Sequence, residues 1–419
     1  MKVYKFGGAS VRNAEGVRNL RKIIDEEQHL FIIVSAMGKT TNALEKVFEG
    51  LQKGYKALSQ EHIAQLRQYH AEIINELWCG EKQIEQVEAL FDELECVATQ
   101  TRYQPSDAEL WYDTIVAFGE LISTTIISEY LRYAGVPNRW IDMRKAIRTE
   151  QRHKDASVDL EASAPLLKTA VEGCGERIFV GQGFIGGAPD GTTTTLGREG
   201  SDYSAAVVAN LLDAESMAVW KDVDGVLNAD PKIFPDAVKI TELNYLDTIE
   251  LAYSGAQIIH PKTIKPLQNK NIPLYVRPFG DKRKPGTVIR GLSSSVDVPI
   301  LILKKEQVLL TIRSRDFSFV LEEKFSQIFT LLERFRIKAN LIHNSAVNLS
   351  LCVDNSWHID EAIEALHEAG FDVMRSGDME LLTIRGYTNE LLRRYAEGPQ
   401  VFIRQSTQAT ARIVRKKQK

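Results

Sequence analysis

The segment KFGGAS, near the beginning of the chain, places a lysine beside two adjacent glycines. Residues 2–6 alternate polar and apolar side chains, as a strand does, and Asn13 can cap the helix expected to follow. Between these elements Gly7 and Gly8 permit a tight turn whose free N–H groups would face an anion. Lys5 would stand beside that turn at the end of the strand. By itself the segment predicts either a phosphate-binding turn or a plain tight turn.

A second segment, GTTTTLGREGSDYSAA (191–206), combines more chemically active side chains. A threonine-rich strand ends in a glycine turn that carries Arg198 and Asp202, and an alanine-rich helix follows. Arginine can bind a carboxylate through two parallel hydrogen bonds, and the start of a helix favours negative charge. A purely structural turn does not need an arginine and an aspartate so close together, so this segment predicts a ligand site.

Three further segments place polar side chains at the ends of strands or inside a helix. VSAMGKTTN (34–42) leads a buried strand into small residues and hydroxyls, which suit a ligand or simply a polar loop with Thr41 as helix cap. Glu120 stands in the otherwise apolar FGELIST, so it either meets a cation in the core or receives a ligand amine. WKDVDGVLNADPK (220–232) ends a strand in acids that form hydrogen-bonding turns or approach a nucleotide and its Mg²⁺.

Taken together, these residue types fit phosphoryl transfer to a carboxylate. That reaction requires positioning and positive charge around the moving phosphoryl group, and the acceptor carboxylate needs no general base. The sequence contains no Ser–His–Asp elbow, no His/Cys cluster with metal-ligand spacing and no GxGxxG dinucleotide motif.

The elements that must position these side chains alternate between strand and helix, which indicates an α/β sandwich with a mainly parallel central sheet. Strands are predicted at 2–6, 30–34, 139–141, 177–180, 217–221 and 272–276. The largely helical stretch 44–133 reads as an insertion or lid. We expect this first domain to cover residues 1–291.

The composition of the chain changes at the serine-rich segment LSSSVD (292–297), which indicates a linker. The second domain, 298–419, begins with a strand–helix–strand–strand–helix–strand order over about 306–376, typical of a ferredoxin-like α+β unit. A second, shortened set of elements follows over about 379–416.

Composition narrows the class of protein. A length of 419 residues predicts two or three domains, and 44% hydrophobic with 26% charged residues is typical of a globular protein. The net charge of −4 argues against nucleic acid as a partner. No apolar run reaches the roughly 18 residues of a membrane helix, so no membrane partner is expected. Scattered cysteines and a start that enters a strand directly predict a cytoplasmic location.

Six segments, in this order, resemble the aspartate kinases of the amino-acid kinase family: KFGGAS, VSAMGKTTN, FGELIST, LGREGSDYSAA, DVDGVLNADPK and GAQIIHPKTI. The resemblance extends from Met1 to about Arg290, and the remainder is similar to the ACT regulatory region of these enzymes. It implies a three-layer amino-acid kinase fold and a homodimer formed through the ACT-like region. It also implies ATP- and Mg²⁺-dependent phosphorylation of the L-aspartate β-carboxylate, the first step towards lysine, threonine and methionine.

The resemblance also implies roles for individual residues. Lys5, with Gly7 and Gly8 beside it, would reach the transferred phosphate, and Asp202 would orient Lys5. The substrate side would comprise Thr41, Glu120, Arg198 and Ser201, with Glu120 on the amino group and Arg198 on the carboxylate. ATP would be contacted by Lys221, Asp222, Leu227, Lys232, Gln257 and Ile258.

The chain departs from the family pattern around the nucleotide. Gln257 stands where a second phosphate-binding lysine is usual, and Lys221 stands where threonine is usual. We expect Lys221, or less favourably Lys262, to supply the missing charge. Glu199 replaces a glycine, which is unfavourable unless its carboxylate points to solvent or pairs with a cation. Leu227 replaces a tyrosine near the adenine.

The ACT-like region departs as well. Asn340 stands where an aspartate is usual, and Ser345 is followed by Ala346 rather than by glutamate. Since the acids that would bind an effector's amino groups are partly missing, we expect weak or absent inhibition by lysine.

Two alternatives remain open from the sequence. The chain can be a sister kinase that acts on glutamate or acetylglutamate, although the ACT-like tail and the helical insertion favour aspartate. It can instead be a non-catalytic amino-acid sensor, which Gln257 and Glu199 support and the joint presence of Lys5, Arg198 and Asp202 opposes.

Overall fold

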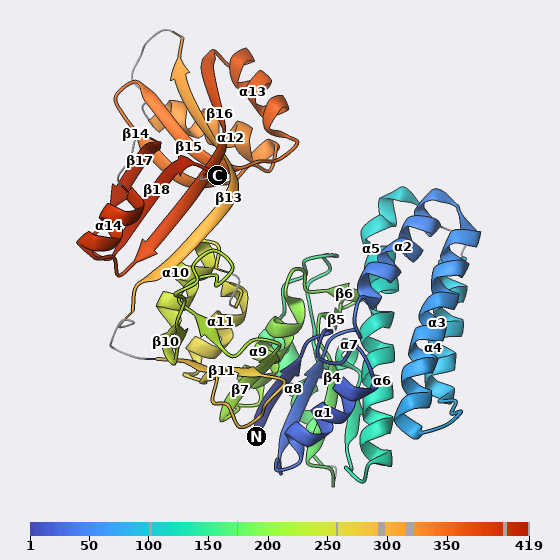
Figure 1. Ribbon diagram of the computed structural model, residues 1–419. Helices are drawn as coiled ribbons and strands as arrows, with labels where there is room; N and C mark the ends of the chain where they lie inside the picture. Colours follow the sequence, from blue (N-terminus) through green and yellow to red (C-terminus); the bar gives the residue numbers. More distant parts are fainter. Residues whose placement is uncertain are drawn as a thin grey trace. The chain divides into compact units, whose positions relative to one another are not determined.

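The computed structural model divides into two compact units (Figure 1). It describes residues 1–99, 103–173, 175–256, 259–291, 298–315, 322–396 and 400–417. The first unit comprises Met1–Val226, Thr241–Ile249 and Ile258–Ser295, and the second comprises Leu227–Ile240, Glu250–Gln257 and Val296–Lys419. The predicted domain limits, 1–291 and 298–419, stay a prediction, while two short segments before residue 258 group with the second unit.

An eight-stranded sheet forms the centre of the first unit, in the order β10-β12-β11-β7-β1-β2-β4-β3. The strands are β1 (Lys2–Phe6), β2 (Leu30–Val34), β3 (Arg139–Ile141), β4 (Ile178–Gln182), β7 (Ser216–Lys221), β10 (Glu242–Asn244), β11 (Leu274–Pro278) and β12 (Thr287–Arg290). The β11–β12 pair is antiparallel and the other described pairs are parallel. This confirms the predicted, mainly parallel sheet and its six expected strands, with β4 and β11 beginning slightly later than expected, whereas β10 and β12 were not predicted.

Helices cover both faces of this sheet, which gives three layers. One face packs against α1 (Ala14–Ile24) and the helical stretch α2 (Thr40–Lys53), α3 (Lys56–Trp78), α4 (Glu85–Ala98), η1 (Pro105–Asp107), α5 (Ala108–Val116) and α6 (Phe118–Tyr133). Beyond the opposite face lie α8 (Leu160–Val171), α9 (Gly200–Leu211) and α11 (Pro261–Asn269). Smaller elements are α7 (Met143–Ala146), α10 (Tyr245–Tyr253), β5 (Ile185–Gly187), β6 (Thr193–Thr195), β8 (Val226–Leu227) and β9 (Lys239–Ile240).

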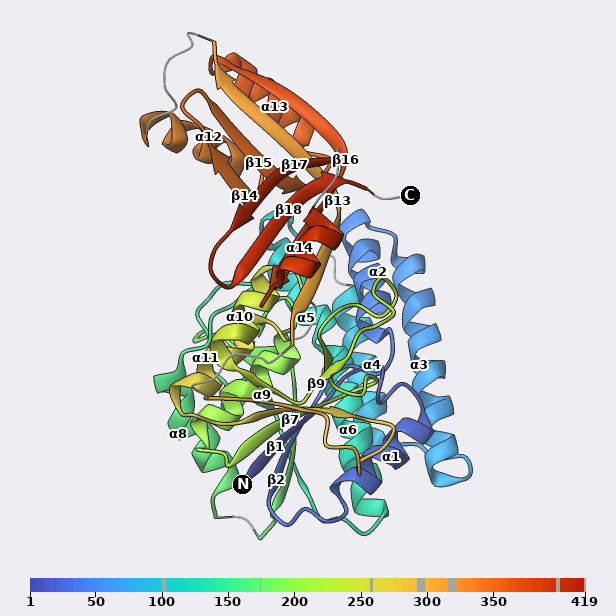
Figure 2. The ribbon, with the colours of Figure 1, turned by 60° about the vertical axis from the view of Figure 1, so that its left-hand side comes forward.

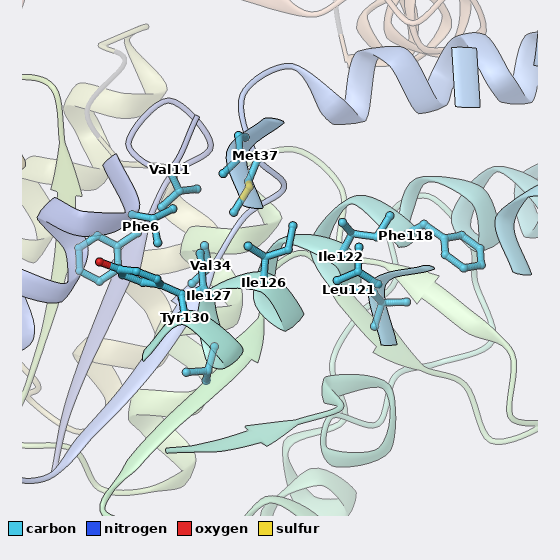
Figure 3. Close-up of a cluster of buried hydrophobic side chains, with 14 of the residues drawn as sticks. Phe6, Val11, Val34, Met37, Phe118, Leu121, Ile122, Ile126, Ile127 and Tyr130 are labelled. Atoms are coloured by element: carbon cyan, nitrogen blue, oxygen red, sulfur yellow. The ribbon is translucent and has the colours of Figure 1, made fainter. Parts of the chain in front are cut away.

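Successive side chains of β1 point to opposite faces of the sheet, so Tyr4 and Phe6 lie on one face and Lys5 lies on the other. Tyr4 and Phe6 join the hydrophobic core with α6, and Figure 3 shows Ile127 and Tyr130 of α6 beside Val34 of β2. Each such buried side chain contributes about 1.5–3 kcal/mol to folding. Lys5, between the two aromatics, therefore points to the opposite face, towards α9.

One stretch of the described chain, Pro105–Tyr133, has the length and apolar composition of a membrane span. Its apolar window is 89% buried inside the protein, as a core helix would be.

The second unit contains a six-stranded sheet in the order β14-β15-β13-β16-β18-β17, with antiparallel pairing throughout the described strands. Its strands are β13 (Ile300–Ser314), β14 (Ala339–Asn344), β15 (Asn348–Asp354), β16 (Phe371–Arg385), β17 (Val401–Ser406) and β18 (Thr410–Lys416), and its helices are α12 (Glu322–Arg334), α13 (Ile359–Glu368) and α14 (Asn389–Ala396). The first half has the predicted ferredoxin-like order. Fold class is thus confirmed for both parts of the chain.

The long strands β13 and β16 connect the two halves of this sheet. The beginning of β13, Ile300–Lys304, pairs with the end of β16, Leu381–Arg385, and a register shift follows between Lys304 and Leu309. The second half therefore has four strands: the end of β16, β17, β18 and this beginning of β13. We expected its strands only from about 379 onward, because pairing with residue 300 leaves no local signal in the sequence.

Candidate active site

The centre of the site is a buried ion pair at the ends of neighbouring strands. The Lys5 Nζ lies 2.7 Å from Oδ1 of Asp202, in the first turn of α9, and Nζ of Lys221 at the end of β7 lies 3.5 Å from Oδ2. β1, β2 and β7 lie side by side (Figure 2), so parallel pairing brings their carboxyl ends to one edge. Burial raises the pKa of Asp202, but Lys5 and Lys221 outweigh it and hold that pKa below its usual value.

The turn after β1 requires glycine because two loops meet there. A Cβ on Gly8 would lie 2.5 Å from the carbonyl oxygen of Ala36, and the Gly8 carbonyl accepts a hydrogen bond from the N–H of Gly38 at 2.9 Å. This contact holds the KFGG turn against the VSAMGKTTN loop. At Gly7 a Cβ would lie 3.5 Å from Lys5 Nζ, an ordinary contact, so space alone does not demand glycine there.

The carboxylate of Glu120 is buried, and only one of its two oxygens accepts a hydrogen bond from the described residues. Its Oε1 accepts a hydrogen bond from the Ala36 N–H at 3.2 Å, while Oε2 finds no partner among the described residues. The side chain is 3% exposed, and burial raises its pKa to about 8. An orphaned carboxylate oxygen at a cavity wall is suited to an ammonium group of a ligand.

These groups line one cavity of about 860 Å³. Eight of the predicted residues lie on its wall: Lys5, Gly8, Thr41, Glu120, Arg198, Ser201, Asp202 and Lys221. The cavity thus collects cations, a partly satisfied carboxylate and hydroxyls, which can together hold an amino acid beside a phosphoryl group.

The remaining predicted nucleotide residues either do not line this cavity or lie outside the described residues. Asp222 lines a separate cavity of about 670 Å³ between α1 and the end of β11. Leu227 and Lys232 belong to the second unit. Gln257 and Ile258 lie outside the described residues.

Two predicted replacements for the charge missing at Gln257 have distinct surroundings. Lys221 lines the main cavity. Lys262 donates to Oδ1 of Asp155 at 2.9 Å and to the Leu196 carbonyl at 3.1 Å, so its ammonium is already engaged. Lys221 is engaged as well, by Asp202 at 3.5 Å, so the difference is that Lys221 lines the cavity that holds Lys5, and its role as the replacement stays a prediction.

Sequence reasoning missed three residues on the rim of the cavity. The Tyr112 hydroxyl donates to Glu45 Oε1 at 2.9 Å, and Lys154 Nζ lies 4.7 Å from the centre of the Tyr112 ring. Their positions come from three separate loops and helices, so no spacing in the sequence links them.

Asp113 was also missed, although it organises this rim. It is fully buried and accepts hydrogen bonds from the Lys154 N–H, from His153 and from the N–H and hydroxyl of Thr195. These bonds join α5 to β6, the strand that leads into the Arg198 loop. The available signal was a lone aspartate in the apolar run of α5.

No group of three or more His, Cys, Asp or Glu side chains among the described residues is arranged to hold a metal ion. Asp202, the acid nearest Lys5, is already engaged by two ammonium groups.

Comparisons with known proteins agree with this architecture. The model of the "Amino acid kinase family" matches residues 1–278. The lysine-sensitive aspartokinase 3 of Escherichia coli (strain K12) is 32% identical over 361 residues, which cover 84% of this chain and 78% of that protein. The aspartokinase of Chlamydia trachomatis serovar D is 34% identical over 323 residues, 73% of this chain and 69% of that protein.

A solved structure extends the likeness over both units. E. coli aspartokinase III in complex with aspartate and ADP, in the R-state, has a TM-score of 0.80 and 27% sequence identity, covering 99% of this chain and 96% of that one. The chain belongs to the amino acid kinase family, and within it to the aspartokinases.

Proposed function

We propose that this aspartokinase transfers the γ-phosphate of ATP to the β-carboxylate of L-aspartate, giving 4-phospho-L-aspartate. The observation that carries the proposal is the joint placement, around one cavity, of the orphaned Glu120 oxygen, the Arg198 side chain and the Lys5–Asp202 pair. These groups complement the ammonium group and the carboxylate of one amino acid and the phosphoryl group that is transferred to it.

In this proposal the acceptor is held at two points. The substrate ammonium binds Glu120 Oε2, and the α-carboxylate binds the exposed guanidinium of Arg198, with hydroxyls of Thr41 and Ser201 on the same wall. Fixing both ends leaves the β-carboxylate as the free nucleophile. Placement of this kind supplies much of the rate enhancement in phosphoryl transfer.

Lys5 stabilises the charge of the transferred group. As the β-carboxylate oxygen bonds to the γ-phosphorus, the bond to the bridging oxygen breaks and ADP leaves with the electron pair. Lys5 is held at 2.7 Å by Asp202, so its ammonium needs little reorganisation to meet the equatorial oxygens. Lys221, on the other oxygen of Asp202, would supply the second cation in place of Gln257.

The nucleotide is expected to arrive with Mg²⁺, which neutralises phosphate charge and is carried largely by the phosphates themselves. We further propose a cytoplasmic homodimer that associates through the ACT-like sheet. β14 and β17 are the edge strands of this sheet, and an edge strand presents unpaired backbone groups that can pair with a second copy. Light scattering at several protein concentrations tests the dimer.

The reaction is tested by incubating the protein with L-aspartate, ATP and Mg²⁺ and trapping the acyl phosphate with hydroxylamine. We expect aspartate-dependent hydroxamate together with ADP release. Hydroxamate from L-glutamate instead would assign a sister kinase. Aspartate binding without turnover would support the sensor.

A further inference from the structure

Lys154, on the wall of the cavity, has a backbone conformation that lysine rarely adopts. Its φ is +66°, in the left-handed region where a residue with a Cβ is strained. The buried Asp113 fixes this conformation, because its two carboxylate oxygens accept from the Lys154 N–H at 3.0 and 3.2 Å. Strained residues that are fixed in this way cluster at active sites and ligand-binding turns, so the strain at Lys154 indicates a use for its side chain.

The segment that carries Lys154 runs beside the loop that carries Arg198. The Ala156 N–H donates to the Thr195 carbonyl at 2.9 Å, and the Thr195 N–H donates to Asp113 at 3.0 Å. Asp113 therefore holds one segment at Lys154 itself and the other segment at Thr195, shortly before Arg198.

The residues next to these two cations are in contact with each other. A Cβ on Gly197, the residue before Arg198, would lie 2.5 Å from Oδ1 of Asp155. Asp155 directly follows Lys154, so the ammonium and the guanidinium belong to turns that touch. Both side chains line the same cavity and can therefore reach one group of a ligand together.

The ammonium of Lys154 lies on an aromatic side chain that is itself held in place. Lys154 Nζ lies 4.7 Å from the centre of the Tyr112 ring, a cation–π contact. The Tyr112 hydroxyl donates to Glu45 at 2.9 Å, and the Phe48 ring packs at 90° to the Tyr112 ring with centroids 5.6 Å apart. In the described part of the chain no carboxylate forms an ion pair with this ammonium, so its hydrogen-bond donors can serve a ligand.

We propose that Lys154 is a second cation for the α-carboxylate of the amino-acid substrate, beside Arg198, an inference that rests on the proposed function. The phosphoryl side of the cavity has its own cations, because Lys5 and Lys221 both pair with Asp202. A carboxylate has two oxygens, so it can accept from a guanidinium and an ammonium together. With the α-carboxylate held by two cations, the β-carboxylate of aspartate is the one that faces the phosphoryl group.

The test is the dissociation constant for L-aspartate, measured by titration calorimetry on the full chain. Lys154→Met keeps the apolar stem but removes the charge, and should weaken binding about five-fold, a modest effect because Lys154 is exposed. Lys154→Arg keeps a cation and should retain most of the affinity. Lys145→Met, at an exposed lysine of α7 that does not line this cavity, is the matched control and should bind normally.

Two further measurements separate the charge from folding and from the nucleotide. Lys154→Gly removes the charge and relieves the left-handed strain, so it should bind aspartate as weakly as Lys154→Met while melting at or above the temperature of the unaltered protein. The dissociation constant for Mg·ADP should be the same in Lys154→Met and in the unaltered protein, since the ammonium is assigned to the amino acid.

Equal aspartate affinities of Lys154→Met and Lys145→Met would overturn the proposal. So would weaker binding of Mg·ADP by Lys154→Met with unchanged binding of aspartate, because the ammonium would then serve the nucleotide. Hydroxamate formation by the unaltered protein is a separate readout. If hydroxamate forms while Lys154→Met binds aspartate normally, only this inference fails, whereas aspartate binding without hydroxamate contradicts only the proposed reaction.

Discussion

Two buried polar clusters, one in each unit, differ in how completely the protein satisfies them. Around Lys5, the pair with Asp202 opens on a cavity, and Glu120 keeps an oxygen without a partner in the described part of the chain. In the ACT-like sheet, Asn340 and Gln307 are 8% and 1% exposed, and they lie in a closed network of hydrogen bonds.

In the closed network, the side chains of Lys304, Gln307, Asn340 and Asp354 hydrogen-bond to one another. Lys304 Nζ donates to Asn340 Oδ1 at 2.8 Å, and Asn340 Nδ2 donates to Gln307 Oε1 at 2.8 Å and to Asp354 Oδ1 at 2.9 Å. Gln307 Nε2 completes the network by donating to Asp354 at 2.8 Å. A satisfied network contributes to stability, whereas a buried group left open reserves its interaction for a ligand.

The largest effect should follow from breaking the open cluster at its cation. Lys5→Ala removes the charge that faces the phosphoryl group and leaves Asp202 buried beside Lys221 alone. We expect hydroxamate formation to fall about 10³-fold in kcat. Lys53→Ala, a surface lysine paired with Glu49, is the matched control and should keep the normal rate. Comparable turnover of Lys5→Ala and the control would exclude the role given to Lys5.

Glu120→Gln should separate function from stability. The loss of a charged partner for the substrate ammonium should raise KM for aspartate about 30-fold.

The same variant should change how stability depends on pH. Burial raises the pKa of Glu120 from 4.5 to about 8. Between these two pH values, the Glu120 carboxyl is protonated in the folded protein but ionised in the unfolded protein. The contribution of Glu120 to the free energy of unfolding therefore falls as pH rises from 4.5 to 8. Thermal melts should show the variant gaining stability over the unaltered protein towards pH 8; an identical pH dependence would contradict this account.

Lys221→Ala tests whether this lysine replaces the charge missing at Gln257. We expect about a ten-fold loss in kcat/KM for ATP, smaller than for Lys5 because Lys221 is 30% exposed at its side chain. Lys270→Ala, whose ammonium pairs with Asp213, serves as control. Steady-state kinetics that leave ATP affinity and turnover unchanged in Lys221→Ala would refute the replacement.

In the closed network the same kind of deletion should affect stability instead. Asn340→Ala removes the acceptor of Lys304 Nζ and the amide donor to the buried Gln307 Oε1, so the free energy of unfolding should fall by about 1–3 kcal/mol. Asn344→Ala, an exposed asparagine on the same strand, should change it little. Urea unfolding of both variants gives the comparison, and equal stabilities would show that the network is not closed in solution.

The smallest effect is expected from lysine itself. Asn340 carries no charge and its amide is engaged within the protein, so millimolar lysine should leave the steady-state rate unchanged. Strong inhibition under these conditions would mean that the network opens to admit an effector.

The catalytic half of this comparison was largely predictable from the sequence, because its residues lie in short motifs at the ends of strands. Lys5, Glu120, Arg198 and Asp202 were each found beside a local signal, and their roles stay predictions. The contact of Glu199 with His260 was not predictable, since it joins segments 61 residues apart with no shared periodicity.

The ACT-like half shows the same limit. Its helices and the strands β14 and β15 followed from local patterns in the sequence. The network around Asn340 did not, because Lys304 and Gln307 lie on either side of an irregular part of β13. The polar character of each residue was evident, whereas its partners depend on the register between strands.

The most direct test of the open cluster is the proton balance of aspartate binding. At pH 7 the raised pKa keeps Glu120 largely protonated, so receiving an ammonium group requires the proton to leave. Calorimetric titration in two buffers of different ionisation enthalpy should therefore show release of about one proton per aspartate bound, and none for Glu120→Gln. Binding of aspartate without proton release by the unaltered protein would contradict the account.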